Sequence, residues 1–252
     1  MTDLTGKVVL VTGGSRGLGE GIVRGLAKAG AAVVLNYTRS LDRAQKIAAE
    51  IGPERCHILG AELDQPAQLI KLWNDAVAWK GRVDVLVNNA ATRPSVSMDA
   101  DPFEFDAAWI KTLRVNLVAP AHLTKLAIPH FRKLGMGIIV NIGSRPAFRG
   151  DRPEFFHDGA SKGGLVSLTR GVARFYAKDN VLAYCVSPGM VQSDQLDEFV
   201  RHYGKGQAFD EIPLGEPAKP EEIAHWVVFL ASGKGRYATG ATIDVNGASY
   251  LH

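Results

Sequence analysis

A glycine-rich stretch near the start of the chain, TGGSRGLG over Thr12–Gly19, separates two segments of different periodicity. The continuous apolar run Val8–Val11 precedes it and predicts a buried strand. Apolar residues at helical spacing follow it within Ile22–Ala27. Glycines let the backbone approach a pyrophosphate closely, and the free amides of a helix N-terminus attract an anion. The order strand, glycine loop, helix therefore predicts a nucleotide site.

The same alternation continues along the chain. Six further apolar runs predict strands: Ala32–Leu35, Cys56–Leu59, Val83–Val87, Gly137–Ile142, Val181–Val186 and Ala241–Val245. Strands that are apolar along their whole length are typical of a parallel sheet covered by helices on both faces. We therefore expect a single doubly wound α/β domain over residues 1–252. The less regular residues 190–217 follow the sixth strand, where ligands bind in such sheets, and are a candidate substrate lid.

Composition narrows the classes of partner. The 252 residues are 46% hydrophobic and 22% charged, as in soluble globular proteins, and the net charge of +3 comes from scattered residues. We expect a small-molecule substrate and no nucleic-acid or membrane partner. Cys56 and Cys185 form no CxxC pair, which argues against a disulfide framework or a metal site. No signal peptide or apolar stretch of ~18 residues is visible, so we expect a cytoplasmic protein.

The glycine spacing TGxxxGxG and several later motifs resemble the short-chain dehydrogenase/reductase family, in particular its members similar to 3-oxoacyl-ACP reductases. These motifs are NNAA at Asn88–Ala91, VNL at Val115–Leu117, IGS at Ile142–Ser144, ASK at Ala160–Lys162, SPGMV at Ser187–Val191, KPEEI at Lys219–Ile223 and ATGA at Ala238–Ala241. The resemblance covers essentially the whole chain. It implies a Rossmann-type domain with seven parallel strands in the order 3-2-1-4-5-6-7 and a nicotinamide cofactor.

The resemblance also implies which residues bind that cofactor. They are Gly13, Ser15, Arg16, Gly17, Leu18 and Gly19 in the glycine loop; Tyr37, Thr38 and Arg39 after the second strand; Glu62 and Leu63 near the adenine; Asn89, Ala90 and Lys162 at the ribose; and Pro188, Gly189, Val191 and Ser193 near the nicotinamide. We expect Asn88 mainly to brace neighbouring strands.

The end of the second strand indicates which nucleotide binds. NAD-selective members place an acidic residue there to accept hydrogen bonds from the ribose hydroxyls. This chain has NYTRS over Asn36–Ser40, with no carboxylate before Asp42. The guanidinium groups of Arg16 and Arg39 suit a 2′-phosphate because they offer forked donors. We therefore favour NADP(H) over NAD(H), although both arginines are also compatible with ordinary solvated surface charges.

The family resemblance implies a catalytic set of asparagine, serine, tyrosine and lysine. In that set tyrosine is the general acid or base, lysine lowers its pKa, serine polarises the substrate oxygen and asparagine anchors a water relay. Asn116, Ser144 and Lys162 occupy three of the four places. The fourth, one helical turn before the lysine, holds Asp158. We rank a natural enzyme with altered chemistry above a redox-inactive binder, and that above an engineered inactivating substitution.

An aspartate at this place changes the expected chemistry. Its unperturbed pKa is ~3.9, and a neighbouring Lys162 lowers it further, so we expect Asp158 to be an anion and a poor proton donor at neutral pH. Burial would raise that pKa. An anion is suited to an iminium substrate or to proton abstraction. A simple i,i+4 salt bridge between Asp158 and Lys162 is the alternative. His157 is a candidate proton carrier or a surface residue.

These observations favour an NADP(H)-dependent oxidoreductase acting on a small carbonyl or on an imine or iminium. The alternatives are a non-redox isomerase, dehydratase, aldol-type lyase or cyclase with Asp158 as base, and a catalytically silent nucleotide binder. We also expect a homo-oligomer, a tetramer or a dimer, because two helices have apolar residues on more than one face. These residues are Leu117, Val118, Leu123, Leu126, Ile128, Leu165, Val166, Leu168, Val172 and Phe175.

Overall fold

The computed structural model describes residues 2–251, apart from the side chains at positions 195, 207 and 208. Seven strands in this part of the chain form one sheet: β1 (Val8–Val11), β2 (Ala32–Tyr37), β3 (Cys56–Gly60), β4 (Val85–Asn88), β5 (Gly137–Ile142), β6 (Val181–Pro188) and β7 (Thr242–Val245). All neighbouring pairs are parallel, and the order is β3-β2-β1-β4-β5-β6-β7. The predicted fold class and strand order are confirmed.

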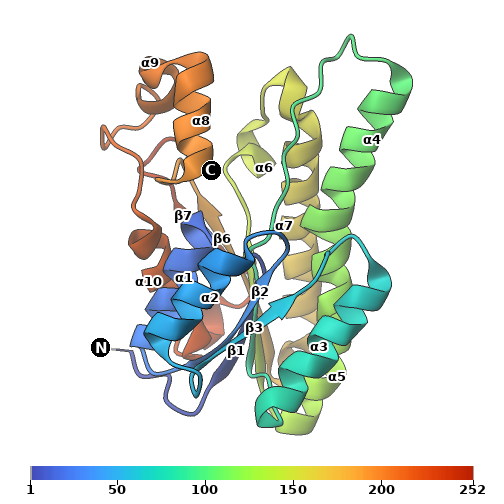
Figure 1. Cartoon of the computed structure of the whole chain (residues 1–252), viewed down its shortest axis with the longest axis vertical. Helices are drawn as coiled ribbons and strands as arrows, with labels where there is room; N and C mark the ends of the chain where they lie inside the picture. The colour runs from blue at the N-terminus through green and yellow to red at the C-terminus, as the bar shows by residue number, and fades with distance from the viewer. Residues whose placement is uncertain (1, 252) are drawn as a thin grey trace.

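The strands bury both of their faces, which explains their uninterrupted apolar sequences. In β1, Val9 and Val11 belong to one hydrophobic core, whereas Val8 and Leu10 belong to the other. Side chains that alternate along each strand thus fill two separate layers of packing. The first core includes residues of α1, α2 and α10, and the second includes residues of α3, α5 and α7. Figure 1 shows these two groups of helices on opposite sides of the sheet.

The helices begin and end as follows: α1 (Gly17–Lys28), α2 (Leu41–Ile51), α3 (Pro66–Lys80), α4 (Pro102–Leu113), α5 (Ala119–Leu134), α6 (Pro146–Arg149), α7 (Phe156–Tyr176), α8 (Asp194–Tyr203), α9 (Lys205–Phe209) and α10 (Pro220–Ala231). Local sequence fixes several starts. Asp101 accepts hydrogen bonds from two amides of the first turn of α4, and Glu222 accepts one from the Lys219 amide before α10. The KPEEI motif thus forms the start of α10.

Three short 3₁₀ turns cover Pro153–Phe155, Ala177–Asp179 and Arg236–Ala238. The strand boundaries differ from prediction by up to two residues. The strand predicted to start at Val83 begins at Val85, and β2 and β6 continue to Tyr37 and Pro188. The predicted strands stopped at the first polar residue, but Asn36 and Ser187 are fully buried and paired in the sheet.

Residues 190–217 contain α8 and α9, which lie above the carboxyl ends of the strands (Figure 1). The sequence indicated an irregular stretch, so these two helices were not predicted. Ser193 is the N-cap of α8, and its hydroxyl accepts a hydrogen bond from the Leu196 amide. Among residues 2–251, none of the helices has the length and apolar character needed to span a bilayer.

Candidate active site

A cavity of about 560 Å³ lies at the carboxyl ends of the strands. Most of the residues predicted to bind cofactor or substrate line it: Gly13, Ser15, Arg16, Gly17, Leu18, Gly19, Thr38, Arg39, Glu62, Leu63, Asn89, Ala90, Ser144, Asp158, Lys162, Pro188, Gly189, Val191 and Ser193. Two predicted residues are not among its lining residues. Tyr37 packs against the core, and Asn116 lies behind Asp158.

The glycine loop forms a tight cradle at one end of this cavity. Gly13 and Gly17 have φ angles of 62° and 51°, which glycine adopts without strain. A Cβ atom on Gly19 would lie 2.1 Å from the Gly13 carbonyl oxygen, so only glycine fits there. The first-turn amides of α1 have no partners within the helix and are free to bind an anion. The cradle has the shape and donor set that a pyrophosphate requires.

Asparagine side chains hold this loop in place. Asn36 at the end of β2 accepts a hydrogen bond from the Gly13 amide at 3.2 Å. The Asn89 amide group donates to the carbonyl oxygens of Thr12 and Gly13 at 2.9 and 3.0 Å. Asn88 instead donates to Asn141 on β5, as a residue that braces strands would. Asn89 thus shapes the cradle from within the cavity wall.

The mouth of the cavity beyond β2 carries a positive charge on each side. Arg16, at the N-cap of α1, and Arg39, after the end of β2, are both exposed lining residues. Thr38 is fixed by a hydrogen bond from its hydroxyl to the Ala61 carbonyl. The lining carboxylates near this mouth are Glu62, after β3, and Asp194, which pairs with Arg43. A ligand entering between α1 and β2 meets guanidinium groups.

Asn116 lies in a π-helical turn, Arg114–Val118, that joins α4 to α5. The Ala119 amide donates to the Arg114 carbonyl, an i to i+5 bond that inserts one extra residue into the helix. The buried Asn116 side chain accepts from the Thr92 amide at 2.8 Å and donates to the Thr92 carbonyl at 3.1 Å. It also donates to Asp158 Oδ1 at 3.0 Å. The turn therefore connects the loop after β4 to α7.

Asp158 lies in the first turn of α7, with its side chain only 8% exposed. One carboxylate oxygen accepts from Asn116, and the other lies 3.5 Å from Arg93 Nε. Arg93 also donates to both carboxylate oxygens of Asp151 and lies 3.6 Å above the Phe155 ring. The predicted i,i+4 salt bridge is wrong within the described chain, because Asp158 pairs with Arg93 and not with Lys162.

Lys162 is also buried, and its ammonium donates to the Ile142 carbonyl at 2.7 Å. Burial lowers the pKa of Lys162, and attraction by Asp158 opposes this shift. Burial raises the pKa of Asp158, and the opposing effects of Lys162 and Arg93 are smaller. Lys162 does lower the pKa of Asp158, as expected, but the expected net lowering is wrong because desolvation dominates. Asp158 retains its proton to higher pH than a free aspartate does.

His157 is fully buried, so the alternative of a surface residue is wrong. Its ring meets Trp109 of α4 edge to face, with centroids 6.0 Å apart. Burial lowers the pKa of His157, which favours the neutral imidazole. It is not a lining residue of the cavity, although Asp158 is its neighbour in sequence. Its position between α4 and α7 is that of a packing residue.

Charged residues that sequence reasoning missed line the opposite end of the cavity from the glycine loop. They are Arg93, Arg145, Arg149, Asp151, Arg152 and Glu211. Part of this set had a signal in the sequence. Arg145 comes directly after Ser144, and Arg149 follows four residues later. Arg145 is the N-cap of the short helix α6, and Arg149 is its last residue. Glu211 comes from the connection after α9, and no local pattern indicated it.

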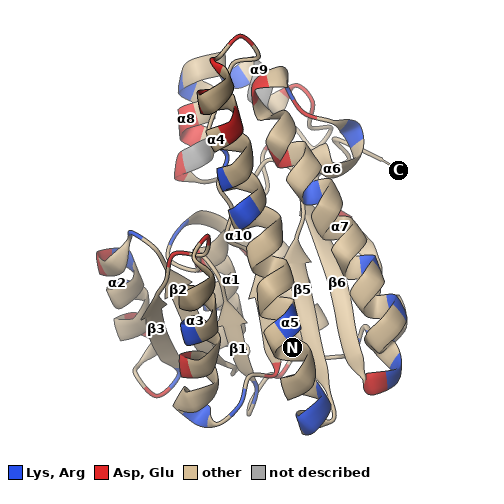
Figure 2. Cartoon of the chain, turned by 90° about the vertical axis from the view of Figure 1, so that its right-hand side faces the viewer, with Lys and Arg blue, Asp and Glu red and all other residues tan. Residues whose placement is uncertain are grey.

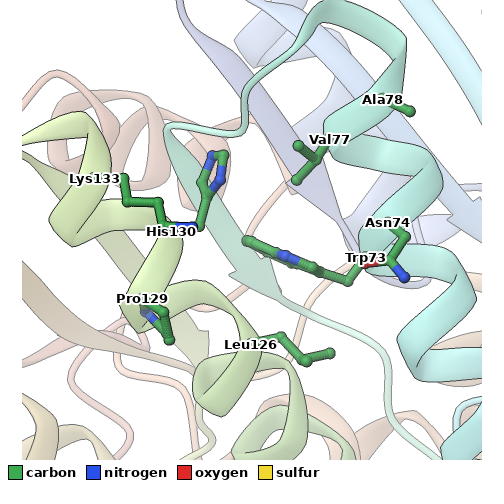
Figure 3. Close-up of a pocket in the computed structure, with 8 residues that line it drawn as sticks. All are labelled: Trp73, Asn74, Val77, Ala78, Leu126, Pro129, His130 and Lys133. Atoms are coloured by element: carbon green, nitrogen blue, oxygen red, sulfur yellow. The ribbon is translucent and has the colours of Figure 1, made fainter.

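A second cavity of about 430 Å³ lies between α3 and α5 (Figure 3). Trp73 and His130 meet edge to face there, with ring centroids 5.7 Å apart. His130 Nε2 accepts a hydrogen bond from the Val83 amide at 3.1 Å. None of the predicted site residues lines this cavity.

Comparison with known proteins gives full-length matches. The family described as Enoyl-(Acyl carrier protein) reductase matches residues 13–248. A 3-oxoacyl-(acyl-carrier-protein) reductase of Aquifex aeolicus is 34% identical, with 98% of each chain covered. Nodulation protein G of a Rhizobium species is 35% identical, again with 98% of each covered. A solved structure, the 3-ketoacyl-(acyl-carrier-protein) reductase from Brucella melitensis complexed with NADH, is 31% identical. It has a TM-score of 0.88 and covers 99% of this chain and 100% of its own.

Proposed function

This chain belongs to the short-chain dehydrogenase/reductase family, and from that premise we propose that it is an NADP(H)-dependent oxidoreductase with Asp158 in place of the tyrosine of the family pattern. Its substrate is a small carbonyl compound or an imine. The buried carboxyl of Asp158 carries this proposal, because it lines the same cavity as Ser144 and the glycine cradle. The proposal of a nicotinamide cofactor is supported by that cradle and by the Brucella relative, whose structure holds NADH.

The residues of this chain divide the chemistry among them. A reduced nicotinamide, when bound, supplies a hydride to the substrate carbon. Asp158 holds a proton at a carboxylate oxygen within a cavity wall from which bulk water is largely excluded, and can transfer it to the oxygen of a reduced carbonyl. Ser144, which lines the cavity, orients that oxygen. Asn116 acts as a positioning residue, because its amide fixes one oxygen of Asp158 and the Thr92 backbone together.

Lys162 has a different role from the one that the tyrosine pattern implies. Its ammonium is held on the Ile142 carbonyl at the end of β5, and not on Asp158. In this position it lines the cavity and can donate to a cofactor ribose. Its charge also limits how far burial raises the pKa of Asp158.

The test replaces Asp158 with asparagine, which preserves size and removes the proton. Oxidation of NADPH is followed with a panel of ketones, aldehydes and cyclic imines. We expect D158N to lose about 10² to 10⁴-fold in kcat/KM, the usual contribution of a positioned acid or base, with unchanged NADPH affinity. Wild-type turnover in D158N contradicts the proposed role of the carboxyl. Much better carbonyl reduction by D158Y than by the natural chain also contradicts it.

The preference for NADP(H) has its own test. The exposed Arg16 and Arg39 flank the cavity mouth, and charged hydrogen bonds contribute about 1.5–3 kcal/mol each. We expect the double variant R16A/R39A to bind NADPH at least about tenfold more weakly, with little change for NADH. The matched control is R174A, since Arg174 is an exposed residue of α7 that does not line the cavity. Tighter binding of NADH by the natural chain refutes this preference.

We also propose that residues 190–217 act as a lid. The segment carries several lining residues of the cavity, among them Met190 before α8, and Leu196 and Phe199 within α8. The attachments between this segment and its surroundings include polar contacts at the surface, such as the Arg43–Asp194 pair across the mouth and the Tyr203–Glu154 hydrogen bond. Contacts of this kind contribute little to stability and can open at low cost.

A further inference from the structure

The end of the cavity next to Ser144 has more positive than negative charge. Arg93, Arg145, Arg149 and Arg152 line it, opposite the carboxylates of Asp151, Asp158 and Glu211. Arg93 is fully engaged, because it binds Asp151 through two oxygens and also lies beside Asp158. Arg152 lies over the Tyr203 ring. Arg145 and Arg149 remain, and they share a single carboxylate.

The guanidinium of Arg145 is unusually buried, since the side chain is only 4% exposed. A buried charge is costly unless ion pairs and hydrogen bonds compensate it. Its Nη1 atom lies 3.2 Å from Glu211 Oε2, but among the described residues it has no well-directed hydrogen bond. Burial and repulsion by Arg149 lower the pKa of Arg145, more strongly than Glu211 and the more distant charge of Asp151 raise it. The group is short of negative charge.

Glu211 does not belong to this pocket by burial. Its side chain is half-exposed, and it comes from the connection after α9, within the segment that we propose as a lid. The same oxygen, Oε2, lies 2.9 Å from Arg149 Nη1 and 3.2 Å from Arg145 Nη1. A carboxylate therefore already fits between the two arginines, although it engages both through one oxygen.

This pocket adjoins the reacting end of the cavity. Arg145 follows Ser144 directly, and its amide donates to the Pro188 carbonyl at the end of β6. We propose that Arg145 and Arg149 form a subsite for a carboxylate of the substrate, which displaces Glu211. The proposal rests on the proposed function and narrows its substrate to oxo acids or imino acids. Glu211 is the internal counter-ion that holds the subsite when no substrate is bound.

The two arginines suit this role because guanidinium groups bind both oxygens of a carboxylate in parallel. A substrate carboxylate can use two oxygens where Glu211 uses one. It would then satisfy the Nη1 atom of Arg145 that Glu211 leaves without a well-directed hydrogen bond. Release of Glu211 would also detach the connection after α9 from α6. Binding of an acid and movement of the lid are thereby coupled.

Binding of unreactive probes tests the subsite separately from turnover. Titration calorimetry on the cofactor-saturated protein compares short alkanoates with the primary amides of the same length, and with inorganic phosphate. We expect the alkanoate to bind at least about tenfold tighter than its amide, as one charged hydrogen bond provides. Equal affinity for acid and amide overturns the proposal, and tighter binding of phosphate overturns its assignment to a carboxylate.

Variants then separate recognition from folding. R149Q, at a partly exposed position, should remove the preference for acid over amide and leave NADPH affinity unchanged. E211Q should strengthen alkanoate binding, because the internal competitor for the arginines loses its charge. A merely structural Glu211 would weaken binding or leave it unaltered on substitution, and either result overturns the proposal. R174Q, away from the cavity, is the matched control and should keep the preference.

A failure of the proposed function gives a different pattern. If the protein binds alkanoates with the expected preference and yet oxidises no NADPH with any oxo acid, the subsite stands and the redox proposal is wrong. If NADPH is oxidised equally well with neutral ketones and with oxo acids, and R149Q changes neither, the oxidoreductase stands and the subsite is wrong.

Discussion

At the scale of single residues, the pKa of Asp158 is set by two opposing effects, desolvation and attraction by nearby positive charges. Removal from water disfavours its charged form, while Lys162 and Arg93 favour it. Sequence alone gave the neighbour on the same helix, and thus only the attractive contribution of Lys162. Arg93 comes from the loop after β4, and Asp158 is buried beside Asn116 of the π turn. Neither could be inferred from the residues around position 158.

The pH dependence of turnover follows from this environment. Burial raises the pKa of Asp158, so the protonated donor persists above the pH at which a free aspartate has ionised. We expect kcat/KM for carbonyl reduction to be maximal below this raised pKa and to fall tenfold per pH unit above it. The reverse oxidation needs the carboxylate, so its rate should rise through the same pKa.

Initial rates in both directions, measured between pH 4 and 9 with the native protein and with D158N, check this prediction. Reduction of a preformed iminium needs no proton from the protein, so its rate should not decline on the alkaline side. In the D158N variant, both the alkaline fall in the reduction rate and the rise in the oxidation rate should disappear. A profile that is identical in the natural chain and in D158N contradicts the assignment of these changes to Asp158.

At the scale of elements, strands were predictable because burial on both faces leaves a continuous apolar signal. The core positions of β1 and β5 follow from that signal, and the Gly137–Ile142 strand has the predicted bounds. The π turn at Asn116 was not predictable. Its extra residue leaves the helical pattern of α4 and α5 unbroken in sequence, and it is recognised only from the bond between Ala119 and Arg114. The grouping of Arg145, Arg149 and Glu211 likewise depends on the path after α9.

The glycine loop gives a sharp prediction at this scale. A Cβ on Gly19 would lie 2.1 Å from the Gly13 carbonyl oxygen and 2.6 Å from Asn89 Nδ2. Because backbone must move to relieve this overlap, we expect G19A to lower the free energy of unfolding by about 1–3 kcal/mol and to abolish tight NADPH binding. Denaturant unfolding and fluorescence titration measure the two effects.

The matched control is a helical glycine with space around it. Nothing lies within 4 Å of a Cβ built on Gly171, in the middle of α7. Since alanine has the higher helix propensity, G171A should raise the free energy of unfolding by about 0.5–1 kcal/mol and leave NADPH affinity unchanged. If G19A binds NADPH with wild-type affinity, the prediction that the cradle has no room for a Cβ at position 19 is wrong.

At the scale of the whole molecule, the exposed apolar surface decides whether the chain associates with copies of itself. Figure 2 shows lysine and arginine spread over the helices of the face that α4, α5 and α7 form. Half of the ten apolar residues on which we based the expected oligomer are buried within the chain itself, including Leu123, Leu165 and Val172. Of the ten, only Val118 and Phe175 are exposed, at 53% and 67%. The argument for self-association therefore rests on a smaller surface than the sequence indicated.

Two residues of α4, Phe103 and Ile110, are also exposed, at 87% and 52%. Large apolar side chains on adjoining helices are costly in water and are typical of a subunit interface. We predict a homo-oligomer, a dimer or tetramer, that buries these helices. Light scattering at micromolar concentration should give a multiple of 27.1 kDa. The variant V118K/F175E should shift the mass toward that of one chain. It should still unfold in a cooperative transition, which shows that the separated subunit stays folded. Because α7 also carries Asp158 and Lys162, dissociation should lower kcat in the same variant. A monomeric mass for the natural chain refutes the prediction.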